Sequence, residues 1–130
     1  MPKTILIVDN YQVAREALGT WLGIIFPQHR IIEAASGEIA AEIAGIELPE
    51  VIIMDIKLPH TDGIETVRRI KSTGHPAQIV MLTLYDDGAY RDAATVAGAN
   101  AVVSMHDMNS KLLPILKEWL LDEQENDDAI

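Results

Sequence analysis

The stretch Val51–Glu65 reads VIIMDIKLPHTDGIE, and its first half decides the fold class. Val51–Met54 is a run of four apolar residues, three of them β-branched. A strand that is apolar at every position has to be buried on both faces, as the strands of a parallel sheet are. Asp55 then puts a carboxylate at the end of the strand, and Pro59 and Gly63 mark a loop before the next helical pattern. This stretch predicts a buried strand that carries an acidic side chain at its carboxyl end.

Four further short apolar runs accompany this strand, and helical patterns separate them. The five predicted strands are Thr4–Val8, Arg30–Ala35, Val51–Met54, Gln78–Leu82 and Ala101–Val103. Apolar residues recur at helical spacing in the interval that follows each strand. This strict alternation predicts an α/β fold, in which helices cover both faces of a five-stranded parallel sheet through right-handed crossovers.

Local signals predict where several of the helices begin and end. Ser36 can cap a helix over Gly37–Ala44. Asp86 can cap a helix that ends near Gly98. Pro114 falls in the first turn of the last helix, where a missing N–H is tolerated.

The composition restricts the classes of function. A chain of 130 residues, 48% of them hydrophobic, is the size of one domain with a packed core. Its net charge of −10 repels phosphate backbones, so we expect no direct contact with nucleic acid by this domain. The sequence has no cysteine, which excludes disulfide scaffolds, thiol catalysis and Cys–zinc sites. The histidines show no metal-binding spacing and are expected on the surface or in loops; they are His29, His60, His75 and His106.

The ends of the sequence predict its location and its extent. Met1–Thr4 leads straight into the first strand without a signal peptide, and no apolar run reaches the roughly 18 residues that a membrane-spanning helix needs. We therefore expect a cytoplasmic domain with no membrane contact. Residues 122–130 hold five acidic residues and no Lys or Arg. They are predicted to form an acidic tail, or the start of a linker, after a domain that spans residues 1–121.

Polar side chains follow the predicted strands at the edge where open α/β sheets bind their ligands. Asp9 and Asn10 come directly after the first strand, Asp55 after the third and Thr83 after the fourth. Two carboxylates and an amide form an oxygen-rich pocket of the kind that Mg²⁺ prefers. An Asp beside a metal ion can also act as a nucleophile and form an acyl phosphate.

Four stretches together resemble the receiver domain of two-component response regulators. They are ILIVDN (Ile5–Asn10), VIIMDIKLPHTDGIE (Val51–Glu65), IVMLT (Ile79–Thr83) and GANAVVSMHD (Gly98–Asp107). The resemblance covers about residues 3–121, and ARE in the first helix and TLYDD before the fourth look most like receivers of the LuxR/NarL-type subgroup. It implies a flavodoxin-like (βα)5 three-layer sandwich with strand order 2-1-3-4-5.

The resemblance also implies roles for the residues at the strand ends. Asp55 matches the phosphoacceptor, which takes a phosphoryl group from a sensor histidine kinase or a small phosphodonor. Asp9, the neighbouring Asn10, Asp55 itself and the backbone carbonyl of Lys57 match the positions that bind Mg²⁺. Thr83 matches the hydroxyl that contacts the phosphoryl group and signals its arrival.

Three positions depart from the pattern of that family. Asn10 stands where a second acid is usual, and the lost charge should cost at least about 10- to 100-fold in metal affinity. Met105 stands where the family has a nearly invariant Lys, and a thioether cannot donate a charged hydrogen bond. Val102 stands where an aromatic switch residue usually rotates inward, and valine has no ring to rotate. Together they imply a degenerate active site with weak Mg²⁺ binding and weakened phosphorylation.

Two functions remain open from the sequence. The first is a phosphorylation switch that regulates an output domain or a partner through the face from about Asp86 to Leu121, with at most Mg²⁺-dependent self-phosphorylation and autodephosphorylation as its chemistry. The alternative is an atypical pseudo-receiver that acts as a phosphate-independent protein-interaction module. In the first case the side chain of Lys57 is a candidate to replace part of the missing cation. A helix-turn-helix output domain in a longer parent protein is expected, and a homodimer is left open.

Overall fold

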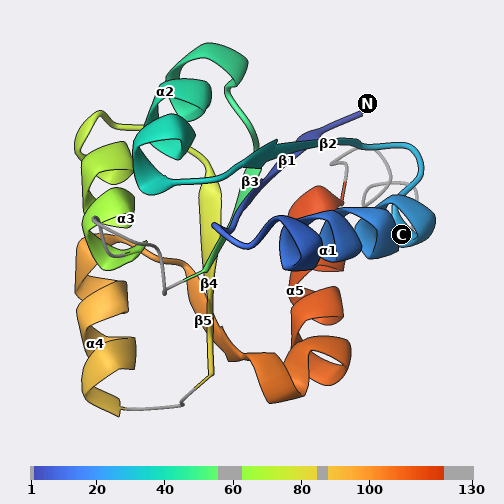
Figure 1. The fold of residues 1–130 in the computed structure, drawn as a ribbon. Coiled ribbons are helices and arrows are strands. Elements are labelled where there is room, and N and C mark those ends of the chain that lie inside the picture. Colours follow the sequence, from blue (N-terminus) through green and yellow to red (C-terminus); the bar gives the residue numbers. More distant parts are fainter. Residues whose placement is uncertain (1, 56–62, 85–87, 122–130) are drawn as a thin grey trace, which may run out of the picture.

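Five strands form one parallel sheet, in the order β2-β1-β3-β4-β5, in the computed structural model, which describes residues 2–55, 63–84 and 88–121 (Figure 1). The strands are β1 (Thr4–Val8), β2 (Arg30–Ala34), β3 (Val51–Asp55), β4 (Gln78–Thr83) and β5 (Ala101–Ser104). The helices are α1 (Gln12–Ile25), α2 (Gly37–Glu47), α3 (Gly63–Ser72), α4 (Gly88–Ala97) and α5 (Leu113–Leu120). Both the alternation of elements and the strand order confirm the predicted flavodoxin-like fold.

The burial of each strand follows from its place in the sheet. β3 is buried at all five positions, and β1 is buried from Ile5 to Val8, because each has a neighbouring strand on both sides and helices on both faces. The edge strand β2 is buried only at Ala34 and keeps Arg30 and Glu33 exposed. The continuous apolar runs of the sequence therefore mark the central strands.

Two hydrophobic clusters lie on opposite faces of the sheet, and they make the fold a three-layer sandwich (Figure 1). Leu6 and Met54 belong to the cluster that packs against α2, α3 and α4. Ile7 and Ile53 belong to the cluster that packs against α1 and α5. This alternation is the two-residue period of a strand whose two faces are both covered.

Most predicted boundaries hold to within a few residues, and Ser36 is confirmed as a helix cap. Its side chain accepts a hydrogen bond from the Ile39 N–H at 3.2 Å, which satisfies one of the free donors at the start of α2. The helix runs on to Glu47, beyond the predicted end at Ala44, and β2 stops at Ala34, one residue short. The predicted cap Asp86 lies outside the described residues.

The segment after β5 contains two short helical turns before the last helix, and the sequence did not predict them. A 3₁₀ turn, η1 (Met105–Asp107), and a π turn, η2 (Met108–Leu112), come before α5. Ser104 begins this segment, because its hydroxyl accepts a hydrogen bond from the His106 N–H at 3.3 Å. Pro114 lies in the first turn of α5, as predicted.

The start of β1 and the end of α5 meet at the surface. The Lys3 ammonium donates hydrogen bonds to the carbonyl oxygens of Trp119 and Leu121, each at 3.4 Å. Trp119 lies in the last turn of α5 and Leu121 is its C-cap residue, and the carbonyl end of a helix favours a cation. In the part of the chain that the structure describes, none of the helices has the length and apolar character required to cross a bilayer.

Candidate functional site

The sheet register brings three polar side chains to the same edge. Val8 of β1 pairs with Met54 of β3, so Asp9, the next residue, comes level with Asp55. Asp55 pairs in turn with Leu82 of β4, and Thr83 follows directly after it. The three polar residues are almost enclosed, with exposed fractions of 9% for Asp9, 5% for Asp55 and 5% for Thr83. The carboxyl edge of the sheet therefore gathers three nearly buried polar side chains, and this strand-end cluster is called the pocket below.

The carboxyl group of Asp9 lies under opposing influences. Burial raises its pKa above the ordinary value, and the charge of Asp55 raises the pKa further. The Tyr11 N–H, which donates to Asp9 Oδ1 at 2.9 Å, lowers the pKa, and so does the positive charge of Arg15. The two carboxyl groups thus lie near enough to repel each other. A cation between them would relieve that repulsion.

Asn10, the residue directly after Asp9, carries a further buried side-chain oxygen. Its Oδ1 atom is buried and has no hydrogen-bond partner among the residues that the structure describes. A buried side-chain oxygen without a donor is uncommon in folded proteins and calls for a ligand such as water or an ion. Two carboxylates and an amide oxygen are hard ligands of the kind that a divalent cation such as Mg²⁺ binds. The residues present therefore fit a metal ion, with one acid fewer than the usual carboxylate cluster.

Arg15 is a residue near the pocket to which the sequence analysis gave no role. From α1, its Nη1 donates to the main-chain oxygen of Asp9 at 2.9 Å. Its Nε donates to Oε1 of Glu33 on β2 at 2.8 Å, and only 15% of the Arg15 side chain is exposed. Asp9 is 6 residues from Arg15 in the sequence and Glu33 is 18, and neither separation is an i,i+3 or i,i+4 helical spacing, so the helical pattern gives no signal for these contacts.

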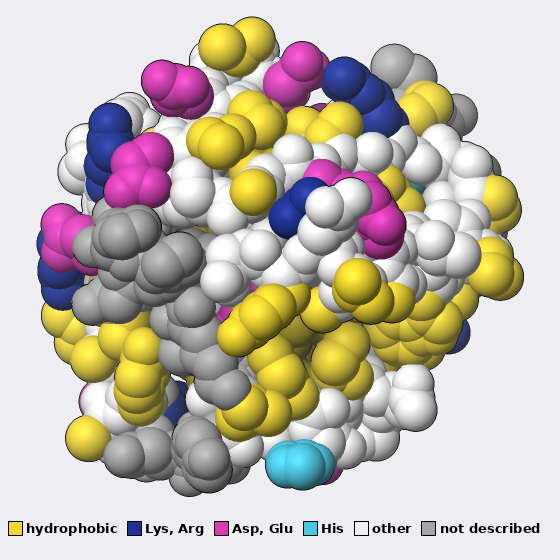
Figure 2. Space-filling model, in the orientation of Figure 1, with side chains coloured by type: hydrophobic (Ala, Val, Ile, Leu, Met, Phe, Trp, Pro, Cys, Tyr) yellow, Lys and Arg dark blue, Asp and Glu magenta, His cyan; other side chains and the backbone are white. Residues whose placement is uncertain are grey.

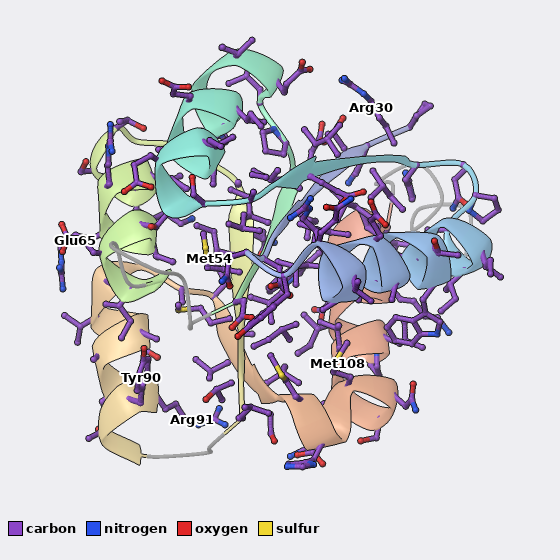
Figure 3. All side chains as sticks on the ribbon, in the orientation of Figure 1. Arg30, Met54, Glu65, Tyr90, Arg91 and Met108 are labelled. Atoms are coloured by element: carbon purple, nitrogen blue, oxygen red, sulfur yellow. The ribbon has the colours of Figure 1, made fainter. Side chains whose placement is uncertain are left out.

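The position that a Lys usually occupies is apolar in this molecule. Met105 opens the 3₁₀ turn after β5, and its half-buried side chain packs against the cluster under α1 and α5. Met108, labelled in Figure 3, packs against the same cluster. Figure 2 shows hydrophobic side chains gathered on this face around the turns that follow β5. The pocket receives no positive charge from this position.

Val102, at the position of the aromatic switch residue, lies in β5 and packs against the cluster under α2, α3 and α4. Arg91 reaches from α4 toward β5 (Figure 3), and its Nη1 donates to the Val102 carbonyl oxygen at 3.0 Å. This bond covers a main-chain acceptor of the edge strand.

Of the predicted site residues, Asp9, Asn10, Asp55 and Thr83 lie at the carboxyl end of the sheet, whereas Val102 lies within β5. Lys57 lies outside the described residues.

The model of the response regulator receiver domain family matches residues 5–116 of this sequence. The chain belongs to this family. Receiver domains are signalling switches of two-component systems rather than enzymes, and they typically bind Mg²⁺ at the site of phosphorylation.

Relatives and solved structures agree with this assignment. The response regulator MprA of Mycobacterium ulcerans (strain Agy99) is 28% identical over 134 residues, which cover 100% of this chain and 57% of that protein. The receiver therefore spans little more than half the length of this curated relative. A two-component response regulator of the LuxR family from Aurantimonas sp. SI85-9A1 is 25% identical, with a TM-score of 0.83 over 91% of this chain and 84% of the other. A response regulator structure from Chloroflexus aurantiacus is 30% identical, with a TM-score of 0.80 over 92% and 98% of the two chains.

Proposed function

We propose that this receiver is a phosphorylation switch whose phosphoacceptor is Asp55. The observation that carries the proposal is the pocket at the carboxyl edge of the sheet, where buried Asp55 lies beside buried Asp9. The Oδ1 atom of the next residue, Asn10, is buried and has no hydrogen-bond partner within the described part of the chain. A carboxylate oxygen of Asp55 attacks phosphorus, the bond from phosphorus to the donor's leaving group breaks, and an acyl phosphate forms. The donor is a sensor histidine kinase or a small phosphodonor.

Asp9, Asn10 and Asp55, with the backbone carbonyl of Lys57, would hold Mg²⁺ in this pocket. When bound, the ion offsets the negative charge of the transferring phosphoryl group. The Asp9 carboxylate has a fixed orientation at one side of the pocket, because the Tyr11 N–H donates a hydrogen bond to it. Thr83 ends β4 beside Asp55, and its hydroxyl would donate a hydrogen bond to a phosphoryl oxygen.

Two residues weaken this chemistry in the proposed mechanism. Asn10 keeps an oxygen for the metal but brings no charge, so the site requires a higher Mg²⁺ concentration than one with a third acid. Met105 cannot neutralise the phosphoryl group, because its thioether carries no charge and donates no hydrogen bond. We infer that the chemistry of the domain is at most Mg²⁺-dependent self-phosphorylation and autodephosphorylation, and that phosphorylation is slow.

The test is intact-mass spectrometry after incubation with acetyl phosphate and Mg²⁺. We expect one phosphoryl adduct on the wild-type domain and none on Asp55→Ala. Asp9→Asn is the companion variant, in which we expect the adduct only at a higher Mg²⁺ concentration. An adduct that survives in Asp55→Ala would assign the phosphoryl group elsewhere. A folded wild-type domain with no adduct at saturating Mg²⁺ would contradict the proposal and favour the phosphate-independent interaction module.

The greater length of the relatives supports a proposal that the receiver is part of a longer protein. We propose that the receiver covers residues 1–121 and regulates a helix-turn-helix output domain in a longer parent protein, to which the acidic segment 122–130 is the linker. The LuxR-family name of the Aurantimonas structure supports this kind of output. Phosphorylation would act through the face from about Asp86 to Leu121, by dimerisation or by release of the output domain. The domain would lie in the cytoplasm, with a sensor histidine kinase as its partner.

A further inference from the structure

Two hydrogen bonds hold the main chain of Asp9 in place. The Asp9 N–H donates to the Ala34 carbonyl of β2 at 3.1 Å. The Asp9 carbonyl oxygen accepts from Arg15 Nη1 at 2.9 Å. Asp9 is therefore held on one side by the sheet and on the other by a side chain of α1. The Asp9 carbonyl belongs to the peptide bond that leads into Asn10, so the Arg15 contact also sets the direction in which Asn10 leaves the strand.

The guanidinium of Arg15 is itself held in place. Its Nε donates to Glu33 Oε1 at 2.8 Å, and the arginine side chain is only 15% exposed. Glu33 belongs to β2, the strand that also accepts the Asp9 N–H. Arg15 thus bridges α1, the end of β1 and β2. An ion pair with a nearly buried arginine in this geometry is better ordered than an exposed pair.

We propose that Arg15 is a positioning residue for the metal site, which shapes the end of β1 so that Asp9 and Asn10 bind one divalent cation together. This inference rests on the proposed function. Its chemical logic is the general one that groups behind metal ligands orient them and that their loss weakens metal binding. The two donors of Arg15 make two bonds at fixed angles, which a lysine ammonium on a flexible stem cannot reproduce.

The alternative is that Arg15 and Glu33 form a stabilising ion pair with no influence on the pocket. The chain offers a matched control for this alternative. Arg30 donates to Glu47 at 2.7 Å, which is a second Arg–Glu pair anchored on β2. Arg30 lies at the amino end of that strand, opposite the carboxyl edge that holds Asp9. Removing either arginine breaks one ion pair, but only Arg15 contacts the pocket.

The experiment is a titration of the metal-free domain with Mn²⁺, in which electron paramagnetic resonance counts the free ion. Mn²⁺ serves as a spectroscopic substitute for Mg²⁺, and no phosphodonor is present. We expect Arg15→Ala and Arg15→Lys to raise the Kd for Mn²⁺ about tenfold or more. Arg30→Ala should leave the Kd within about twofold of wild type, as expected for a distant and independent site. Thermal unfolding of each variant shows that it is folded at the temperature of the titration.

Glu33→Ala is the second variant, and it keeps Arg15 in place but removes its anchor. We expect a smaller rise in Kd than for Arg15→Ala, and this variant and Arg15→Lys decide the matter if Arg15→Ala does not fold. Folded Arg15 variants that bind Mn²⁺ as wild type does would overturn the positioning role and leave the proposed function intact. A wild-type domain that binds no Mn²⁺, even at millimolar concentration, would overturn the proposed metal site itself.

Discussion

Asn10 determines how much negative charge the pocket holds. Burial and the neighbouring Asp55 already raise the pKa of Asp9, so negative charge in the pocket is unfavourable without a cation. A third acid at position 10 would add to that cost in the absence of a cation and would repay it when a cation binds. Asn10 keeps the oxygen and avoids the charge. We therefore expect Asn10 to lower the affinity of the pocket for a metal ion and to stabilise the metal-free state.

The first prediction follows from this exchange. We expect Asn10→Asp to lower the Kd for Mg²⁺ by about tenfold or more and to lower the Tm of the metal-free domain. Isothermal titration calorimetry measures the first effect, and thermal unfolding in EDTA measures the second. Asn10→Ser is the control, since it adds no charge. A metal-free Asn10→Asp domain with an unchanged Tm would show that charge repulsion in the pocket is negligible.

Met105 gives the second prediction. We expect Met105→Lys to speed phosphorylation by acetyl phosphate roughly 10- to 100-fold at fixed Mg²⁺, because a charged donor would then meet the phosphoryl oxygens. Met108→Lys is the matched control, since Met108 packs against the same cluster and the variant adds the same charge three residues later. The measurement is the initial rate of adduct formation by mass spectrometry. Equal rates in both variants would indicate a general effect of net charge.

At the scale of elements, the sequence predicted the order of strands and helices but missed the details set by hydrogen bonds. Hydropathy ended two predicted strands at Met54 and Leu82, whereas the backbone ladder continues through Asp55 and Thr83. A polar residue interrupts an apolar pattern but still pairs its main chain. The turns after β5 were missed for a similar reason, because they depend on the Ser104 cap and on packing against α5.

The sequence predicted most residues of the candidate site, but not Arg15. Asp9, Asn10, Asp55 and Thr83 could be found because parallel strands all end at one edge, which fixes their neighbourhood without coordinates. Arg15 could not be found, because an arginine on an amphipathic helix is ordinarily a solvated charge. Its partner Glu33 lies 18 residues away on another element.

The junction between α4 and β5 yields the third prediction. Gly98 has a φ of 118°, and a Cβ built there would lie 2.7 Å from Cγ of Lys71. The Lys71 stem cannot move aside freely, since its ammonium donates to the Ala77 carbonyl oxygen. We expect Gly98→Ala to lower the free energy of unfolding by about 1–3 kcal/mol, measured by urea denaturation.

Gly45 provides the opposite control for that variant. It lies inside α2 with nothing within 4 Å of an added Cβ. Gly45→Ala should raise the free energy of unfolding by about 0.5–1 kcal/mol, since alanine favours a helix interior and restricts the unfolded chain. A Gly98→Ala domain as stable as Gly45→Ala would show that the α4–β5 junction tolerates a side chain.

For the whole molecule, the dominant physical feature is the net charge of −10. Self-repulsion among surface acids destabilises a compact state, and dissolved salt screens it. Any salt should therefore raise the Tm to some extent.

The strand order is also a property of the whole molecule. The alternation of elements predicts a parallel sheet but not which strands are neighbours, so the order 2-1-3-4-5 came from the family resemblance.

The fourth prediction separates screening from binding. We expect MgCl₂ to raise the Tm more than NaCl at the same ionic strength, because an ion that binds only the folded state adds stability. That contribution is about 2.7 kcal/mol when the free ion is at 100 times its Kd. Asp9→Asn should lose most of the excess over NaCl and keep the screening effect. Differential scanning calorimetry in the two salts measures both. Equal Tm values for the wild type in matched salts would contradict binding of Mg²⁺ at the pocket.

The contact of Lys3 with the last turn of α5 has a mechanical consequence. β1 is a five-residue strand, with Lys3 just before it and the Asp9–Asn10 pair just after it. The Lys3 ammonium donates hydrogen bonds to the carbonyls of Trp119 and Leu121. The single strand β1 therefore connects the end of α5 to Asp9, at the proposed site of phosphorylation. We therefore expect a displacement of the end of α5 to be felt at the start of β1, the strand that leads into the proposed site of phosphorylation.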